Sequence, residues 1–414
     1  MIKYKRVSLE NGLRIIVHED RSTPLVTMNI LYDVGSRDEN PAMTGMAHLF
    51  EHLMFGGSVN IPDYDLPLQM VGAENNAFTN NDITNYYLNV PADNIETGFW
   101  LESDRMLELN FSPKNLDTQK NVVIEEFKQR YLNQPYGDAI LNLRPLAYKV
   151  HPYRWPTIGM DLSHIEKVTL DDTKDFFFSH YAPNNAILCL AGNISTVKAI
   201  SLAEKWFGPL ERRKVAPRNL PQEPLQDEPR FMTIEKNVPS DALYKVWHTC
   251  SRTSNDFQTM DMLTDILAGG ESGRLFVNLV RDRKLFSEIN AYVTSDIDPG
   301  LIILHGNVMK GVDIKTADEA VCEIIENLKI QGAIQDQELE KVKNRFESST
   351  VFSNSSCMNK AVNLSFYELL GDADLINKEV ELYHKVTSEM VEDAAGKYLL
   401  PANCSTLYYK STAE

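Results

Sequence analysis

The feature that most constrains the fold is a pattern that occurs twice, about half a chain apart. Residues 165–192 and residues 383–410 each contain Lys-Val-Thr, a helical stretch, and then Tyr, Pro and Asn before a strand-like run. Thr169 and Thr387 stand at the start of these helical stretches, where threonine is a favoured N-cap. Solenoid repeats have far shorter periods, so this spacing indicates an ancient duplication that produced two similar halves.

A proline-rich segment separates the two halves. Residues 213–230 hold four prolines and many charges, and proline removes backbone hydrogen bonds and stiffens a chain toward an extended form. The chain has 414 residues, which is long for a single hydrophobic core. We therefore predict an N-terminal half over residues 1–212, a linker over residues 213–230 and a C-terminal half over residues 231–414.

Composition excludes several classes of partner. The chain has 41 Lys and Arg residues against 58 Asp and Glu residues, so its net charge is −17 and it would repel a nucleic-acid backbone. No run approaches the roughly 20 apolar residues that span a bilayer. Five scattered cysteines form no Cys-x-x-Cys pair, which argues against a disulfide framework and a thiolate metal site. We therefore expect no nucleic-acid partner and no membrane span.

The first residues lack the apolar core and the small-residue cleavage site of a signal peptide. Residues 1–6 instead lead directly into a strand-like segment. This start predicts a cytoplasmic protein, or a periplasmic one if a leader has been removed.

Local periodicity predicts a mixture of strands and helices. Residues 5–18 and 25–34 alternate apolar and polar side chains and are predicted to be paired strands. Residues 74–91 are predicted to form a hairpin. Helices are predicted over residues 42–56, 92–110 and 113–132. Because strands and helices do not alternate regularly, we expect an α+β fold in which each half is a mainly antiparallel sheet packed with helices.

One short segment has the spacing of a metal site. His48 and His52 are four residues apart, so on a helix both imidazoles lie on one face and can reach a single ion. Glu51 shares that face and can take a proton from a water molecule that the metal activates. The order His-x-x-Glu-His is the inverted zinc-peptidase motif. Two surface histidines on an amphipathic helix are the alternative interpretation.

A catalytic zinc site needs a third protein ligand. Glu125 and Glu126 lie in a segment predicted to be an amphipathic helix, with Val122 and Phe127 expected to pack inward. Spacing alone does not choose between Glu125 and Glu126, and it does not exclude Glu74. It also leaves the metal open, because histidine and carboxylate ligands accept cobalt or manganese as well as zinc.

The sequence resembles the pitrilysin, insulysin and mitochondrial processing peptidase family of zinc peptidases, as a small two-domain bacterial-type member. The resemblance covers nearly the whole chain. Its matching segments are residues 11–13, 34–39, 45–58, 72–73, 76–79, 122–126, 181–185 and 269–275. Glu126 lies 74 residues after His52, close to the family's spacing.

The resemblance implies a function and a set of site residues. Glu126 is implied to be the third ligand of one zinc ion beside His48 and His52, with Glu51 as the catalytic base. The second half is implied to have the same fold without the metal residues. We therefore expect a zinc-dependent endopeptidase that hydrolyses peptides or unfolded polypeptides within a clamshell chamber.

Substrate binding is predicted beside the metal site. The polar segment around Asn76, Ala77 and Phe78 is expected to be an edge strand, to which an extended peptide can add by main-chain hydrogen bonds. The same strand binds peptide in the family that the chain resembles, while an ordinary hairpin is the alternative. Phe55 is a candidate pocket wall for the residue after the cut, although a buried aromatic without that role fits its position equally well.

Two departures from the family pattern bear on activity. Gln119 stands where the family often has a glutamate that supports the metal site. Arg274 matches an Arg that holds substrate in the family, but the accompanying Tyr falls near Ser287, and Tyr292 lies five residues later. Some family members obtain such residues from a second subunit, so we expect a homodimer or a heterodimer with a related subunit. A non-catalytic or partner-dependent subunit is the alternative to an active peptidase.

Overall fold

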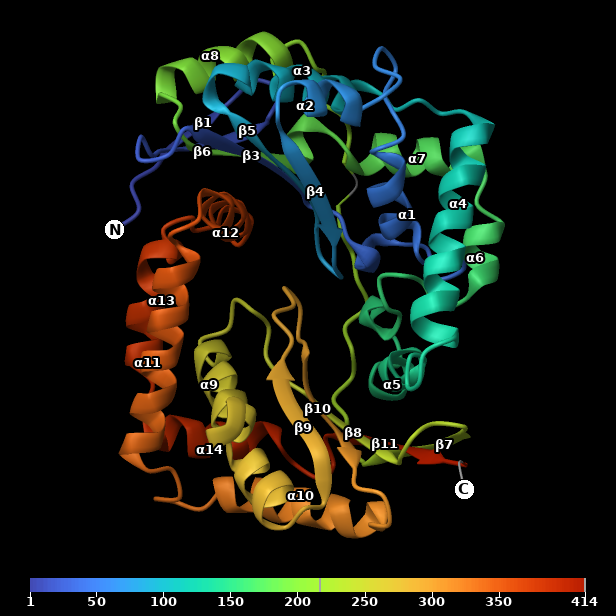
Figure 1. Ribbon diagram of the computed structural model, residues 1–414, viewed down its shortest axis with the longest axis vertical. Coiled ribbons are helices and arrows are strands. Elements are labelled where there is room, and N and C mark those ends of the chain that lie inside the picture. Colours follow the sequence, from blue (N-terminus) through green and yellow to red (C-terminus); the bar gives the residue numbers. More distant parts are fainter. Residues whose placement is uncertain (216, 413–414) are drawn as a thin grey trace. The chain divides into compact units, whose positions relative to one another are not determined.

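The computed structural model describes residues 1–215 and 217–412, which form two compact units (Figure 1). Unit 1 comprises Met1–Lys128, Trp155–Leu220 and Val351–Lys378. Unit 2 comprises Gln129–Arg154, Pro221–Thr350 and the described residues from Glu379 onward. Among the residues described, none of the helices combines the length and the apolar character that a membrane span requires.

Unit 1 is built on a six-stranded sheet. Its strands are β1 (Lys5–Ser8), β2 (Arg14–Glu19), β3 (Leu25–Tyr32), β4 (Glu74–Thr79), β5 (Thr84–Pro91) and β6 (Ala186–Gly192). They lie in the order β1-β2-β6-β3-β5-β4, and β2 and β6 are the parallel pair in an otherwise antiparallel sheet. The interior strand β6 is buried along its whole length, while β4 forms an edge.

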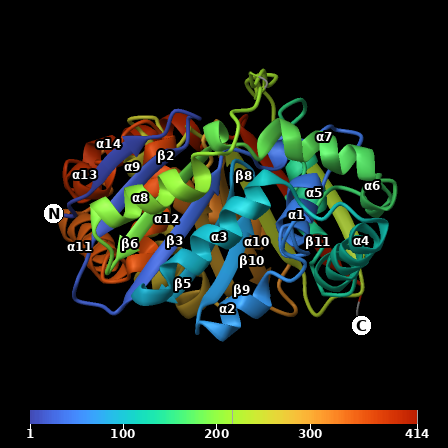
Figure 2. The same cartoon turned by 90° about the horizontal axis from the view of Figure 1, so that it is seen from above.

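Helices cover both faces of this sheet. The helices of unit 1 are α1 (Met46–Leu53), α2 (Asp65–Met70), α3 (Ile95–Leu107), α4 (Pro113–Phe127), α6 (Leu162–Glu166), α7 (Leu170–His180), α8 (Thr196–Phe207) and α12 (Cys357–Leu369). Helices α3 and α8 pack on each other over one face, and α12 lies against the opposite face (Figure 1). Seen from above, α3 and α8 lie over the strands (Figure 2).

Unit 2 contains a five-stranded sheet with the same plan. Its strands are β7 (Arg230–Lys236), β8 (Ala242–His248), β9 (Phe286–Val293), β10 (Leu301–Val308) and β11 (Cys404–Ser411). They lie in the order β7-β11-β8-β10-β9, with β7 and β11 parallel and the other pairs antiparallel. This order reproduces β2-β6-β3-β5-β4 of unit 1. The predicted α+β fold with two similar halves is confirmed.

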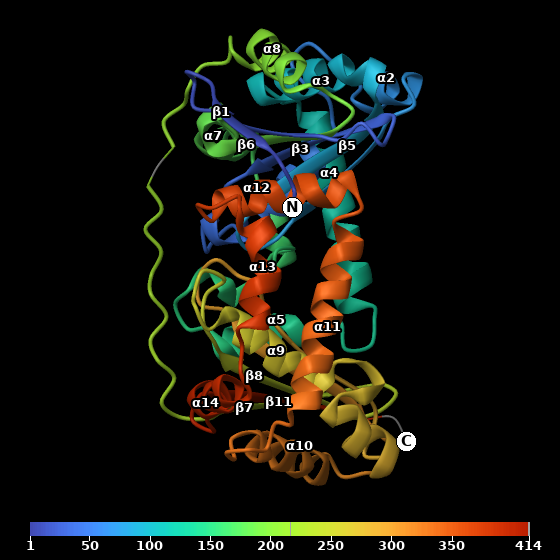
Figure 3. The same ribbon diagram turned by 90° about the vertical axis from the view of Figure 1, so that its left-hand side faces the viewer.

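The helices of unit 2 also lie on both faces of its sheet. They are α5 (Ala139–Ala147), α9 (Phe257–Ala268), α10 (Ile314–Leu328), α11 (Asp336–Ser353), α13 (Leu375–His384) and α14 (Ser388–Tyr398). The end of α11 and the start of α13 lie within Val351–Lys378, which belongs to unit 1. One apolar cluster joins α9, α10 and α14 to one face. Helix α5 packs on the other face, opposite α10 (Figure 3).

The two copies of the sequence repeat form equivalent helices. Thr169 caps α7 by accepting a hydrogen bond from the Asp172 backbone N–H at 3.2 Å. Thr387 caps α14 by accepting one from the Met390 backbone N–H, also at 3.2 Å. Both predicted N-caps are confirmed.

Each unit receives a helical segment from the other half of the sequence. In unit 1, Leu364 of α12 is fully buried against sheet residues that include Ile187. In unit 2, Leu143 of α5 is buried against sheet residues that include Leu407. The predicted division at residues 213–230 into contiguous halves does not describe this exchange. The described residues 213–215 and 217–229 contain no helix or strand, and residue 216 lies outside the described residues.

The predicted pairing of residues 5–18 with 25–34 is wrong. Residues 5–18 form a hairpin of β1 and β2, and β6 lies between β2 and β3. The hairpin turns at Gly12, where φ is +91° and a Cβ atom would come within 2.7 Å of the Asn184 Cβ. Strand β6 can occupy the interior position because its residues are all apolar or glycine. There it is buried along its whole length and pairs on both edges.

Candidate metal centre

Helix α1 is held in place by its apolar face. Met46, Ala47, Leu49, Phe50 and Leu53 are buried. The Phe50 ring stacks on that of Tyr181, with centroids 5.2 Å apart. Because residues three and four apart share a face of a helix, this packing leaves His48, Glu51 and His52 together on the face that is partly open to solvent.

The N-terminus of α1 is capped by a carboxylate that the sequence analysis did not identify. Its N-cap residue, Gly45, has φ of +91°, and a Cβ atom there would come within 2.7 Å of the Ile158 carbonyl oxygen. Glycine offers no side chain for a cap. Instead, the buried Glu39 carboxylate accepts hydrogen bonds from the backbone N–H groups of Gly45 at 2.9 Å and Ala47 at 2.8 Å. A glycine at the start of a predicted helix, with an acidic residue shortly before it, is the signal that could have revealed this role.

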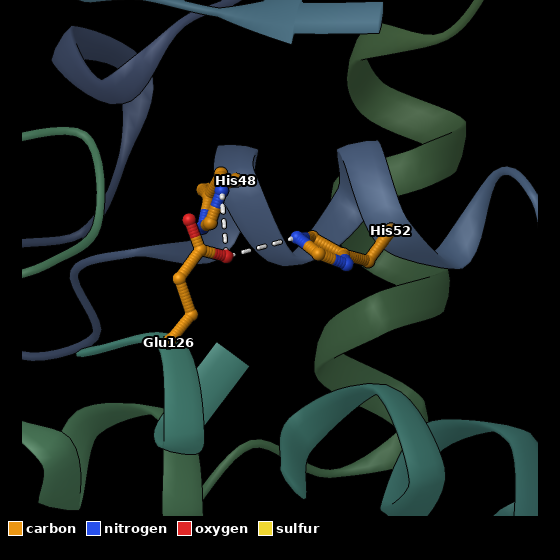
Figure 4. A group of neighbouring side chains, drawn as sticks. All are labelled: His48, His52 and Glu126. Atoms are coloured by element: carbon orange, nitrogen blue, oxygen red, sulfur yellow. Dashed lines mark ion pairs between the residues drawn. The ribbon is translucent and has the colours of Figure 1, made fainter. Parts of the chain in front are cut away.

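The three predicted metal ligands lie together (Figure 4). The Glu126 Oε2 atom is 3.7 Å from His48 Nε2 and 3.5 Å from His52 Nε2. The two imidazole rings are nearly perpendicular, with centroids 4.9 Å apart. The histidines come from α1 and the glutamate from α4, so the group depends on the packing of these two helices.

The dimensions of this group fit a zinc ion. With metal–ligand bonds of ~2.0–2.2 Å, the ligand atoms of a tetrahedral site lie about 3.3–3.6 Å apart. The His–Glu distances of 3.5 and 3.7 Å are close to that range, and one ligand atom from each residue lies within 4.8 Å of the others. The side chains are 12%, 24% and 18% exposed for His48, His52 and Glu126, so solvent can reach the group.

The structure also separates Glu126 from the other candidate glutamates. Glu125 points to solvent and pairs with Lys128 at 2.7 Å, its side chain 72% exposed. Glu74 is exposed at the start of β4. Val122 is 45% exposed, so the expectation that it packs inward is wrong. The buried face of α4 is formed by Leu116, Val123, Ile124 and Phe127, and this helical phase turns Glu126 toward α1.

Glu51 is held beside the metal group by a hydroxyl. Thr79, at the end of β4, donates a hydrogen bond to Glu51 Oε2 at 2.6 Å. Burial raises the pKa of both Tyr86 and Tyr181 well above the usual value, and the Glu51 carboxylate raises it further. Both phenols therefore stay protonated at neutral pH. Thr79 was part of the segment that the resemblance singled out, but its contact with Glu51 could not be read from spacing.

The predicted substrate residues near this group differ in their exposure, and three of them lie on β4. The strand is an edge of the sheet, as expected. Asn76 is exposed and Ala77 is half-buried, while Phe78 packs against the apolar cluster that includes α12. Phe55 is half-buried after α1, edge-to-face with Tyr64 at 5.6 Å between centroids.

The remaining predicted residues lie elsewhere. Gln119 is half-buried on α4, two helical turns before Glu126. Arg274 belongs to unit 2, where its guanidinium donates hydrogen bonds to Glu338 at 2.7 and 3.0 Å and to the Ala333 carbonyl at 2.7 Å. These contacts hold Arg274 on its own unit.

Two long segments of this chain match known families. Residues 14–157 match the family described as insulinase, peptidase family M16, and residues 167–346 match a domain described as the peptidase M16 inactive domain. The chain belongs to the insulinase-like M16 family of peptidases. The predicted membership of the pitrilysin and insulysin superfamily is confirmed.

Individual relatives agree with this assignment. The zinc protease PqqE of Helicobacter pylori is 27% identical over 99% of this chain and 93% of its own length. The beta subunit of the mitochondrial-processing peptidase of Caenorhabditis elegans is 26% identical over 49% of this chain and 44% of its own length. The crystal structure of a protease from Helicobacter pylori has a TM-score of 0.93 at 25% identity, covering 99% of this chain and 100% of that one.

Proposed function

We propose that this protein is a zinc-dependent endopeptidase that holds one zinc ion on His48, His52 and Glu126. The observation that supports this most strongly is the convergence of these three side chains at distances that suit zinc, with Glu51 on the same face of α1. The names of several relatives as zinc proteases agree with the proposal.

When bound, zinc polarises the scissile carbonyl and lowers the pKa of water toward neutrality. Glu51 accepts the proton of the attacking water and then delivers it to the leaving nitrogen of the peptide bond. The hydrogen bond from Thr79 orients the Glu51 carboxylate for both transfers. Glu39 holds the start of α1 and so fixes the helix on which both histidines stand.

Peptide binding is proposed along the free edge of β4. Asn76 and Ala77 offer backbone groups for pairing with an extended substrate, and such pairing tolerates many sequences. Phe55 and Phe78 are proposed to contact substrate side chains. Arg274 is also proposed to bind substrate, once its ion pair with Glu338 opens. Gln119 is proposed to support Glu126 without adding charge.

The active form is proposed to be a homodimer or a heterodimer with a related chain. One relative is named as a subunit of a processing peptidase, which supports the heterodimer. Light scattering on the purified chain, with peptide cleavage measured on the same sample, separates an active homodimer from a chain that needs a partner.

Substitution of Glu51 tests the mechanism. Glu51→Gln keeps the shape of the side chain but removes the base, so cleavage of a quenched fluorescent peptide should fall by about 10²–10⁴-fold. Zinc should stay bound, because Glu51 is not a proposed ligand. Glu125→Gln is the matched control, since Glu125 is an exposed glutamate of α4 and its loss should leave cleavage unchanged.

Unchanged cleavage by Glu51→Gln with zinc bound would refute Glu51 as the base. If the unmodified protein binds zinc but cleaves no peptide, alone or mixed with a related subunit, the alternative of a non-catalytic subunit is correct.

A further inference from the structure

Helix α9 of unit 2 occupies the place that α1 has in unit 1. The glycine nine residues after His48 is Gly57, with φ of +90°, and the glycine nine residues after Asp261 is Gly270, with φ of +72°. In this register Asp261 and Asp265 stand where α1 has His48 and His52. Thr264 stands at the position of the proposed base.

The counterpart of α4 in unit 2 is α11, because each is the second helix after the hairpin at the edge of its sheet. The two helices are compared by counting from the first residue of each. Glu126 is the fourteenth residue of α4, and Ser349 is the fourteenth residue of α11. Position 349 therefore lacks the third ligand. Among the residues that the structure describes, the group of His48, His52 and Glu126 is the one set of three ligand side chains close enough to share an ion.

A cavity nevertheless remains at this place in unit 2. It has a volume of about 250 Å³ and is lined by residues that include Asp261, Thr264, Asp265, Tyr292, Ser349 and Tyr383. At ~30 Å³ per water molecule, this volume equals about eight waters, which is room for one long side chain. Unit 2 has thus lost the metal ligands but kept a hollow where unit 1 has its candidate metal centre.

Among the residues that line this cavity, carboxylates outnumber cations. Asp265 is paired with Arg345 at 2.9 Å. The Asp261 carboxylate accepts a hydrogen bond from the Tyr383 hydroxyl at 2.5 Å. Of the nearby cations, Arg252 is paired with Glu379, and Lys341 donates to Ser272. The lining therefore has two carboxylates against one guanidinium.

Burial raises the pKa of both Asp261 and Asp265, because each carboxylate loses hydration on the wall of the cavity. At Asp261 the hydrogen bond from Tyr383 and the charge of Arg252 oppose this increase in pKa, while the repulsion from Asp265 adds to it. Aromatic rings complete the lining: Phe346 and Tyr383 stack with centroids 3.4 Å apart, and Tyr292 is half-exposed. Carboxylates together with aromatic faces attract organic cations.

We propose that this cavity binds the guanidinium or ammonium group of a basic side chain. Asp261 is the anionic contact, and the aromatic rings pack against the aliphatic stem. The further step, that this cation belongs to a peptide substrate, rests on the proposed function. The net charge of −17 agrees with it, because an acidic protein attracts basic peptides. The expected ligands are peptides with an arginine or a lysine.

Calorimetric titration of the purified full-length chain with Nα-acetyl-arginine amide tests this directly. Nα-acetyl-citrulline amide is the neutral ligand of the same shape, and it should bind at least tenfold more weakly. Asp261→Asn should weaken binding of the arginine derivative at least tenfold. Glu326→Gln is the matched control, because Glu326 is an exposed acid on α10 that pairs with Lys329, and its loss should not change binding.

A second variant tests the same cavity independently, in case Asp261→Asn does not fold. Ser349 is exposed at the rim, so Ser349→Lys should fold, fill the cavity with a fixed cation and abolish binding. Equal binding of the two ligands, or binding that survives both Asp261→Asn and Ser349→Lys, would overturn the proposal. The ligands contain no bond for an endopeptidase to cut, so this result is independent of whether the chain cleaves peptides.

Discussion

Helices α1 and α9 are two versions of one element, each packed beside the edge strand of a sheet with the same strand order. In unit 1 the helix presents His48, Glu51 and His52 on one face. In unit 2 the corresponding side chains are Asp261, Thr264 and Asp265. The buried residues of each helix are mainly apolar.

The comparison shows which parts of the fold are needed for packing and which are needed for chemistry. The apolar face and the glycine after the helix are present in both units, because both helices must pack on a sheet. The polar face differs completely. A duplicated fold can therefore keep its core while the chemistry of one copy changes through a few side chains.

The largest effect is expected when α1 is given the side chains of α9. The double substitution His48→Asp and His52→Asp removes both proposed nitrogen ligands, so peptide cleavage should fall at least about a hundredfold. Loss of a residue that only supports a metal ligand already costs ~10–100-fold in metal affinity or activity. The fold should survive, since α9 already has this pair on an equivalent helix. Peptide cleavage and thermal unfolding are measured together. A folded variant whose cleavage rate stays within tenfold of that of the unmodified chain would contradict this comparison of α1 with α9.

Helices α12 and α5 should contribute similarly to the stability of units 1 and 2. Leu364→Ala in α12 and Leu143→Ala in α5 each leave a cavity against a sheet, so each should lower the free energy of unfolding by about 2–5 kcal/mol. Val197→Ala, at an 80% exposed position of α8, should change it by less than about 0.5 kcal/mol. Urea unfolding measures all three. A negligible loss for either leucine would mean that its helix is dispensable to the unit.

A smaller effect is expected from one half-buried histidine in each unit. Burial lowers the pKa of His180 in unit 1, outweighing the attraction of Asp38, and burial lowers the pKa of His248 in unit 2. The unfolded chain then binds more protons below about pH 7, so stability is present above the ordinary histidine pKa and is lost as pH falls.

His180→Asn or His248→Asn should therefore flatten the decline in unfolding free energy between pH 7.5 and pH 5.5. The slope that one group contributes is at most about 1.4 kcal/mol per pH unit. Urea unfolding at the two pH values measures it. An unchanged slope in both variants would show that these side chains are not held neutral by burial.

Local patterns were sufficient to predict much of this molecule. The duplication was visible because both copies keep the threonine caps of α7 and α14. Strand β4 was recognised as an edge by its polar residues. The spacing of His48 and His52 predicted a shared ligand face, because helical periodicity is a local property.

Long-range packing was not available from the sequence. The insertion of β6 between β2 and β3, and the exchange of α5 and α12, depend on contacts between residues far apart in the chain. Spacing left the choice between Glu125 and Glu126 open, because it depends on the phase of α4. The expectation that Val122 packs inward had that phase wrong. Glu39 escaped notice because its partners are backbone N–H groups.

Metal content of the purified chain tests the central claim most directly. Elemental analysis should find one zinc per chain in the unmodified protein and less than about a tenth of that in Glu126→Ala, because removal of one of the three proposed ligands would leave a weak site. Absence of any divalent metal after incubation with zinc, or full retention of zinc by a folded Glu126→Ala protein, would contradict the account.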